Sequence, residues 1–391
     1  MELKWEYPLP TNEKSSDSQY ESPILVNDDG IYYVSHSTEG RILHIIDQES
    51  GTGIQYTLPG TPFVLPHDYF FCLHSSAAVL YAGNLHFIQG NTVLKTLDFT
   101  ELGKVTSHIT LGDSLYIVCS GKESTLCCIS MKTMAVIWKT EITNSKPYRA
   151  GELSVFDDLI ACYGKDQLLI INPKTGAIIK SLKIPRTDKL FSPIRIDDDT
   201  ILLGFTNWSN AGILKYQLST KQVLWKHKRK FEGPQLNCRI YRYSDKAIWV
   251  KNNTELIAVN INNGEEAYQI RTAPWLYTDL HFLDNHILYG TAGADGYFNC
   301  LDAETGRLQW SIFLKNGCAY YAIHQNTVIL GDFENNITQV ALGNGELRHQ
   351  LRLDSEIVGQ LTVSENNLYT VVWSNDQKPV RLCKISLNEL T

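Results

Sequence analysis

The stretch Ala303-Glu-Thr-Gly-Arg-Leu-Gln-Trp310 joins a short polar turn to an apolar strand that carries a large aromatic. Glycine adopts a positive φ without steric cost, so it can close a tight turn between two strands. Degraded copies of this stretch recur, with the turn glycine or its substitute near positions 51, 134, 176, 221, 264, 306 and 345. Apart from the first interval, which is about twice as long, the markers are about 42 residues apart. Such a period indicates a repeat architecture.

One repeat is complete between residues 279 and 314. Four apolar runs, separated by turn residues, read as strands: Asp279–Leu283, His286–Gly290, Tyr297–Leu301 and Arg307–Leu314. Four short antiparallel strands make a sheet that is too thin to bury both faces, and copies stacked around a ring bury them. The sequence therefore predicts an all-β protein, a single closed β-propeller of four-stranded antiparallel blades.

The number of blades follows from the turn markers. Markers near positions 51, 92, 134, 176, 221, 264, 306, 345 and 390 give nine units of about 43 residues each. Eight blades stay open as an alternative, because the unit at 61–104 is the least like its siblings.

The two ends of the chain are expected to complete one blade together. Residues 1–9 look like a fourth strand without its sheet, and Val380–Thr391 looks like a third strand without its partner. We expect the N-terminal strand to join the last blade and close the ring, which removes both free edges. The expected organisation is one domain, 1–391, with a closing strand at 1–9, a polar linker at 10–22 and repeats of about 42 residues from 23 to 391.

Large aromatics occupy a fixed place on the fourth strand, eight residues after the start of the turn. They are Trp138, Trp225, Tyr268 and Trp310, while Lys180 and His349 hold the same place in two other repeats. An aromatic there is suited to docking one blade on the next, and buries about 150–250 Å². We assign these four aromatics a structural role.

The motif of Ala303, Gly306 and Trp310 resembles the docking turn of the PQQ-like repeat β-propellers, whose architecture is similar to that of WD40 proteins. Weaker copies spread the resemblance over essentially the whole chain. The resemblance implies a propeller, commonly with eight blades. It also implies, as one possible activity, an exported quinoprotein dehydrogenase that holds PQQ and calcium at its centre, with a vicinal disulfide over the cofactor.

The residues do not favour that activity. Cys127-Cys128 is a vicinal pair, but it lies in the run Thr125–Ser130, which reads as a strand, whereas a vicinal disulfide needs a strained turn. The sequence has neither a calcium loop of the Asp-x-Asp-x-Asp-Gly type nor a Cys-x-x-Cys-His haem site. We expect no cofactor and no metal, and a PQQ-dependent dehydrogenase is the least favoured function.

Composition and charge argue against nucleic-acid-binding, membrane-spanning and secreted proteins. The formal net charge of −7 argues against a nucleic-acid binder, whose affinity depends on Lys and Arg. No apolar run approaches the roughly 18 residues that cross a bilayer, and the N-terminal residues lack a secretory core. Nine cysteines cannot all pair. We therefore expect a cytoplasmic, monomeric propeller with free thiols and no membrane contact.

Motifs for catalysis are missing. There is no Gly-x-Ser-x-Gly, no His-Glu-x-x-His and no glycine-rich phosphate loop. The run Asp197-Asp-Asp199 reads as a turn rather than a metal cluster. The basic run Lys226-His-Lys-Arg-Lys230 resembles an import signal or an anion site, but its place at the exit of a fourth strand favours a solvated edge strand. We assign no catalytic residue.

Aromatic and basic side chains gather in loops expected on one face of the disk, around the channel. The candidate partner-binding residues are Tyr148, Arg149, Trp208, Phe231, Trp275, Tyr277, Tyr320 and Trp373. Such a composition is typical of an interface core, although bulky residues can also plug a wide ring. The favoured function is a non-enzymatic scaffold for protein–protein interaction. The alternative is a propeller that binds a glycan or small molecule, with or without lyase or hydrolase activity.

Overall fold

The computed structural model describes residues 1–9, 23–37, 40–58, 69–73, 76–81, 83–89, 92–142, 152–163, 167–184, 187, 189–207, 209–230, 239–272, 275–373 and 380–387. Within these ranges every regular element is a β-strand, apart from the short 3-10 turn Thr100–Leu102. The predicted all-β class is therefore confirmed. The predicted linker at 10–22 lies outside the described residues.

The strands fall into two compact units. The first unit comprises Met1–Leu97, Pro274–Asp302 and Arg307–Thr391, and the second comprises Asp98–Ala273 and Ala303–Gly306.

The second unit holds four antiparallel sheets of four strands in sequence order. They are β10 (Lys104–Leu111), β11 (Ser114–Ser120), β12 (Ser124–Ser130) and β13 (Ala135–Ile142); β14 (Glu152–Phe156), β15 (Leu159–Tyr163), β16 (Gln167–Ile171) and β17 (Ile178–Lys183); β18 (Lys189–Arg195), β19 (Thr200–Asn207), β20 (Asn210–Gln217) and β21 (Gln222–Lys230); β22 (Ile240–Tyr243), β23 (Lys246–Lys251), β24 (Glu255–Asn260) and β25 (Glu266–Arg271).

The first unit holds the remaining sheets. Two are β2 (Leu25–Asn27), β3 (Gly30–Ser37), β4 (Gly40–Ile46) and β5 (Gly53–Leu58), and β6 (Tyr69–Leu73), β7 (Ser76–Tyr81), β8 (Asn84–Gln89) and β9 (Thr92–Asp98). A further run is β26 (Trp275–Leu276), β27 (His281–Leu283), β28 (His286–Asp302), β29 (Leu308–His324), β30 (Thr327–Asp332), β31 (Asn336–Ala341) and β32 (Leu347–Arg352). The last sheet is β33 (Glu356–Ile357), β34 (Thr362–Ser364), β35 (Asn367–Trp373), β36 (Arg381–Ser386) and β1 (Glu2–Pro8).

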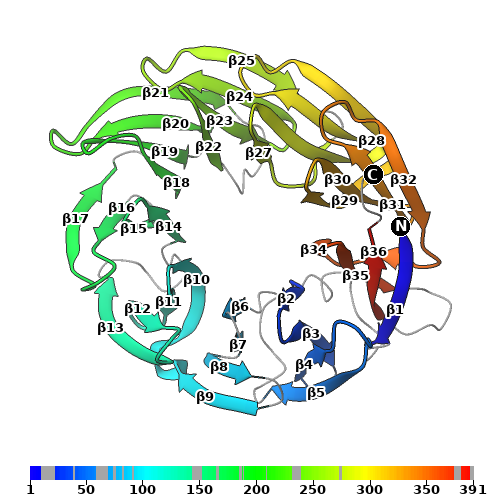
Figure 1. Cartoon of the computed structure of the whole chain (residues 1–391). Helices are drawn as coiled ribbons and strands as arrows, with labels where there is room; N and C mark the ends of the chain where they lie inside the picture. The colour runs from blue at the N-terminus through cyan, green and yellow to red at the C-terminus, as the bar shows by residue number, and fades with distance from the viewer. Residues whose placement is uncertain are drawn as a thin grey trace. The chain divides into compact units, whose positions relative to one another are not determined.

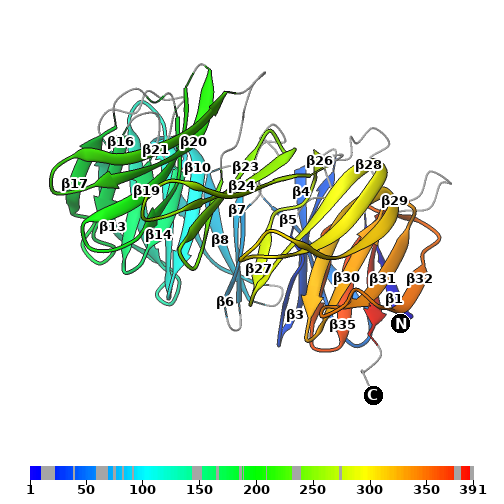
Figure 2. The same ribbon diagram turned by 90° about the horizontal axis from the view of Figure 1, so that it is seen from above.

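The long strands β28 and β29 each serve two predicted strands, and they run side by side in Figure 2. The first half of β29 pairs with β28, and its second half pairs with β30, so β29 links two four-stranded sheets. Counted this way, the described strands make nine sheets, in agreement with the nine repeats of the sequence.

The expected pairing of the chain ends is present in the first unit. Strand β1 lies antiparallel to β36, from Glu2 opposite Ser386 to Pro8 opposite Arg381 (Figure 1). The Arg381 guanidinium donates to both carboxylate oxygens of Glu6, at 2.7 and 2.8 Å. Closure of all nine sheets into one ring, and a single domain over 1–391, stay predictions.

Apolar cores lie between consecutive sheets within each unit. In the second unit, for example, Phe205 and Leu214 of one sheet pack with Ile170 and Leu182 of the preceding sheet. In the first unit, Tyr7 and Leu382 of the last sheet pack with Tyr33 and Ile46 of the sheet that contains β3. Each sheet is therefore buried by its neighbours, as the repeat argument requires.

A titratable group is buried in the contact between β1 and β4. His44 is fully buried, with Ser35 Oγ at 2.6 Å from its Nε2 and Tyr7 Oη at 3.5 Å from its Nδ1. Burial lowers the pKa of His44 to about 4. The folded protein therefore holds this imidazole neutral at pH values at which an exposed histidine is charged.

We predict that the free energy of unfolding falls as the pH drops from about 6.5, the unfolded pKa, toward about 4. In that window the unfolded chain binds the proton and the folded chain does not, so the loss through His44 reaches about 3 kcal/mol. Urea titrations across the window measure the slope, and His44→Gln should flatten it. Superimposable slopes for the two proteins would refute the assignment.

Candidate functional site

Five aromatics on outer strands make the same contact with the turn of the following sheet. Each ring N–H or hydroxyl donates to a backbone carbonyl three residues before the last residue of the turn. The donors and acceptors are Trp5 and Gln48 (3.1 Å), Trp138 and Pro173 (2.9 Å), Trp225 and Ile261 (3.0 Å), Tyr268 and Ala303 (2.9 Å), and Trp310 and Leu342 (2.8 Å). A polar tip is thus satisfied while the ring is buried.

The last residue of each of these turns is a glycine that lies flat against the ring. Gly345 has a φ of +69°, and a Cβ on it would stand 2.8 Å from the Trp310 ring. Gly306 has a φ of +70°, with the Tyr268 ring 2.6 Å from the same position. Both the backbone conformation and the close approach therefore require glycine.

A β-bulge precedes the docking position in these sheets. Cys128 pairs with Trp138 but Ile129 pairs with Val136, so Ile137 is an extra residue. The same shift occurs before Lys180, Trp225, Tyr268, Trp310 and His349, and before Trp5 at Leu3/Trp5. A bulge bends a strand and increases its twist. This recurring feature is not visible as a motif in the sequence.

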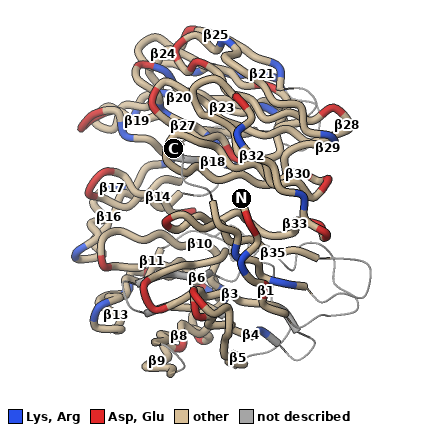
Figure 3. Tube along the Cα trace, turned by 45° about the vertical axis from the view of Figure 1, so that its right-hand side comes forward, with Lys and Arg blue, Asp and Glu red and all other residues tan. Residues whose placement is uncertain are grey.

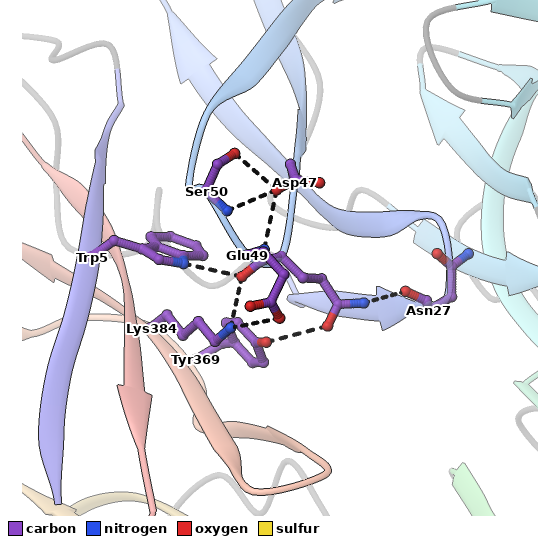
Figure 4. A network of polar contacts seen from close by, with 8 residues as sticks. Trp5, Asn27, Asp47, Glu49, Ser50, Tyr369 and Lys384 are labelled. Atoms are coloured by element: carbon purple, nitrogen blue, oxygen red, sulfur yellow. Dashed lines mark hydrogen bonds and ion pairs between the residues drawn. The ribbon is translucent and has the colours of Figure 1, made fainter.

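Trp5 is a docking aromatic that the eight-residue count missed, because no turn precedes its strand β1 in the sequence. Figure 4 shows the network around it, in which the Gln48 carbonyl accepts from both Trp5 Nε1 and Lys384 Nζ, at 3.1 and 2.7 Å. Tyr369 Oη donates to Gln48 Oε1 at 3.4 Å. Asp47 Oδ1 accepts from the Ser50 backbone N–H at 2.7 Å and from Ser50 Oγ at 2.8 Å, which fixes the turn.

We predict that Trp310→Ala lowers the free energy of unfolding by about 3–5 kcal/mol, because it empties a packed ring site and leaves the Leu342 carbonyl without its donor. Gly345→Ala should cost at least about 1 kcal/mol through its positive φ. Chemical denaturation measures both. A matched substitution, Trp275→Ala, removes a ring that is 68% exposed and should change stability by less than about 0.5 kcal/mol. Equal losses for Trp275→Ala and Trp310→Ala would contradict this account.

The eight candidate partner-binding residues are placed differently by the structure. Tyr148, Arg149, Trp208 and Phe231 lie outside the described residues. The other four, Trp275, Tyr277, Tyr320 and Trp373, all belong to the first unit.

Trp275 and Tyr277 are the most accessible of these. They lie two residues apart on an extended segment and are 68% and 54% exposed. Tyr277 meets Phe333 edge to face, with ring centroids 5.4 Å apart and planes at 75°. We call Trp275, Tyr277 and Phe333 the aromatic platform.

Tyr320 and Trp373 pack into cores instead. Tyr320 is half-buried against the cluster of Ile329 and Ile357, and its hydroxyl donates to the Val358 carbonyl at 3.2 Å. Trp373 is half-buried against the cluster that contains Tyr7 and Val380. These contacts bury much of both rings in cores between sheets.

The backbone behind the platform is held rigidly. β26 pairs with β28 through Trp275 opposite Ala292, and Ala292 in turn lies opposite Gly317 of β29. Across the bend of β28, Thr291 Oγ1 accepts from the Tyr297 N–H at 2.8 Å. Strands of this kind present side chains with little ordering cost on binding.

Acidic residues occur on the same segments as the platform residues. Glu334, the neighbour of Phe333, pairs with Lys315 at 3.2 Å and accepts from Asn316 Nδ2 at 2.6 Å. Asp279 and Asp295 are exposed on the segments that carry and support Trp275 and Tyr277. Over the whole first unit, 23 acidic residues outnumber 11 basic ones. A partner with basic groups around an apolar centre would suit this surface.

No described group of three or more His, Cys, Asp or Glu side chains is placed to hold a metal ion. Asp197 forms a turn, with its Oδ1 accepting from the Asp199 and Thr200 N–H groups at 2.9 and 2.8 Å. Cys127 and Cys128 lie in β12 as separate free thiols. Among the described residues there is no helix that could span a membrane.

The comparisons with known proteins agree on the fold. Residues 209–389 match a family model described as the outer membrane protein assembly factor BamB, which confirms the PQQ-like resemblance over these residues. The solved BamB of Moraxella catarrhalis aligns with a TM-score of 0.53 at 13% identity, covering 81% of this chain and 96% of that one. The computationally designed Ika8 protein aligns with a TM-score of 0.56 at 13% identity, covering 81% and 95%. No curated protein matches the chain by sequence.

Proposed function

We propose that this chain is a non-enzymatic β-propeller that binds another protein through the aromatic platform. The observation that carries the proposal is the exposure of Trp275 and Tyr277, at 68% and 54%, on a backbone fixed by strand pairing. Large aromatics dominate the binding energy of protein interfaces, and isolated rings of this size are costly to leave in water. The match to an assembly factor supports the same class of function.

The exposed fraction of each candidate residue decides its proposed role in binding. Trp275 and Tyr277 are the anchors, and Phe333 supports Tyr277 from the side. Tyr320 packs between the last sheet and the sheet whose β30 precedes Phe333, whereas Trp373 packs between the last sheet and the sheet that contains β3.

Trp275→Ala together with Tyr277→Ala is predicted to abolish capture of the partner from the native host, while the melting temperature changes by less than about 2 °C. The control is Leu308→Ala with Leu347→Ala, which removes two equally exposed side chains, 59% and 57%, from outer strands of the same unit. Quantitative affinity capture with each protein measures the loss. Retained capture by the platform variant, or equal loss in the control, would rule out the platform.

A glycan- or small-molecule-binding propeller is the second candidate, because exposed Trp and Tyr rings also stack on sugar rings. A glycan array with the intact chain separates the two functions. If a soluble glycan binds the intact chain but not the Trp275→Ala, Tyr277→Ala variant, then the ligand of the platform is a glycan and not a protein.

We further propose a cytoplasmic, monomeric protein. The seven cysteines described as free support a reducing compartment. Alkylation of the protein in freshly lysed host cells, with and without prior reduction, tests the compartment, and light scattering tests the assembly state. Thiols that react only after reduction would contradict the cytoplasmic placement.

A further inference from the structure

Strand β21 is an edge strand with an unusual sequence. It is the terminal strand of the sheet β18–β19–β20–β21, so only β20 pairs with it among the described strands. Its nine residues exceed the length of the corresponding strands β13, β17 and β25. Its last five residues are Lys226-His-Lys-Arg-Lys230. A strand edge offers a row of backbone N–H and C=O groups to a further strand.

The basic side chains of β21 divide between its two faces. Lys226, Lys228 and Lys230 alternate along the strand, so they share one face, and all three are exposed. The Lys226 ammonium lies 3.8 Å from the centroid of the Phe205 ring. No ion pair within the described part of the chain involves Lys228 or Lys230.

The other face of β21 is occupied by the neighbouring sheet. Arg229 forms an ion pair with Glu266 of β25, and His227 meets Trp249 edge to face at a centroid distance of 6.2 Å. These contacts hold the strand from one side, while Lys228 and Lys230 on the other face are exposed.

The strand is also fixed against β20 by a close backbone contact. Gly212 of β20 lies opposite Lys228, and a Cβ on it would stand 2.1 Å from the His227 carbonyl oxygen. Phe205 and Trp249, both fully buried, anchor the two sides. The lysine row is therefore presented on an ordered, extended backbone, which lowers the entropic cost of binding.

The charge of the second unit reinforces this row. The unit has 24 Lys and Arg against 19 Asp and Glu, whereas the first unit has 11 against 23. Figure 3 shows the Lys and Arg positions in blue along β21. The potential at this edge therefore favours an anionic ligand, although the whole chain is acidic.

We propose that the Lys226–Lys230 edge of β21 binds an extended acidic peptide segment by adding it as a further strand. Alternate residues of a strand are about 6.6 Å apart, so alternating Asp or Glu side chains of an added strand meet the three lysines in register. The backbone edge distinguishes this ligand from a nucleic acid, because only an extended peptide pairs with its N–H and C=O groups. This inference is independent of the aromatic platform, which lies in the other unit.

The test uses the full-length protein and a blocked, fluorescent eight-residue peptide that alternates Glu with Thr. We expect saturable binding by fluorescence polarisation, and at least tenfold weaker binding of the matched peptide with Gln in place of Glu. Lys228→Glu with Lys230→Glu should weaken binding at least tenfold. Lys132→Glu with Lys174→Glu makes the same charge change at two exposed turn lysines of the same unit and should change it less than twofold. Lys228→Gln with Lys230→Gln serves as the milder variant if the charge reversal lowers the melting temperature.

N-methylation separates strand addition from simple attraction of charge. One peptide carries a methyl group on the backbone nitrogen of every Glu, and a second carries it on that of every Thr. Each peptide thereby loses the backbone N–H donors along one of its two edges only. Strand addition requires that one of these peptides fails to bind while the other binds as the parent does. Equal binding of both would overturn the proposal, and so would displacement of the peptide by a single-stranded oligonucleotide that binds more tightly.

Discussion

The structure depends on one repeated contact, an aromatic ring that lies on a glycine and donates a hydrogen bond to the turn of the next sheet. Trp310 on the Leu342–Gly345 turn is the clearest case, and Trp5 makes the same contact with the Gln48 carbonyl. The contact satisfies a polar group and buries a large ring in one step, so it couples sheets that cannot be stable alone. The bulge before each docking position aims the ring across the gap between sheets.

Much of this framework could be predicted from the sequence, because turn glycines and outer aromatics recur at a fixed period. The repeat predicted the positions of the four docking aromatics. It also predicted that β1 pairs with β36, because each chain end looks like an incomplete part of one sheet. It could not place the long strands β28 and β29, since the glycine-containing residues 293–296 between two expected strands continue as strand, with Asp295 opposite Lys315 and Gly296 opposite Leu314. Nor could it separate Trp275, which is exposed, from Trp373, which packs on a core, because the repeat period does not specify which strand ends are covered by a neighbouring sheet.

The functional proposals follow from what the docking contacts leave uncovered. Within each unit, neighbouring sheets share apolar cores. The aromatic platform projects from the acidic first unit, and the lysine edge of β21 belongs to the basic second unit. These surfaces differ in chemistry, one suited to an apolar and basic partner and one to an extended acidic segment. Under the two proposals, the chain would present two binding surfaces of opposite charge, one in each unit.

Hydrogen–deuterium exchange of the full chain carrying Trp5→Ala tests the central contact most directly. If the ring–turn contact couples the sheets, the amides of β1, of β36 and of the Asp47–Gly51 turn lose protection together, while those of β10 to β17 in the second unit keep theirs. Unchanged protection of β1 and of the turn would show that strand pairing alone holds the chain ends, and would contradict the account.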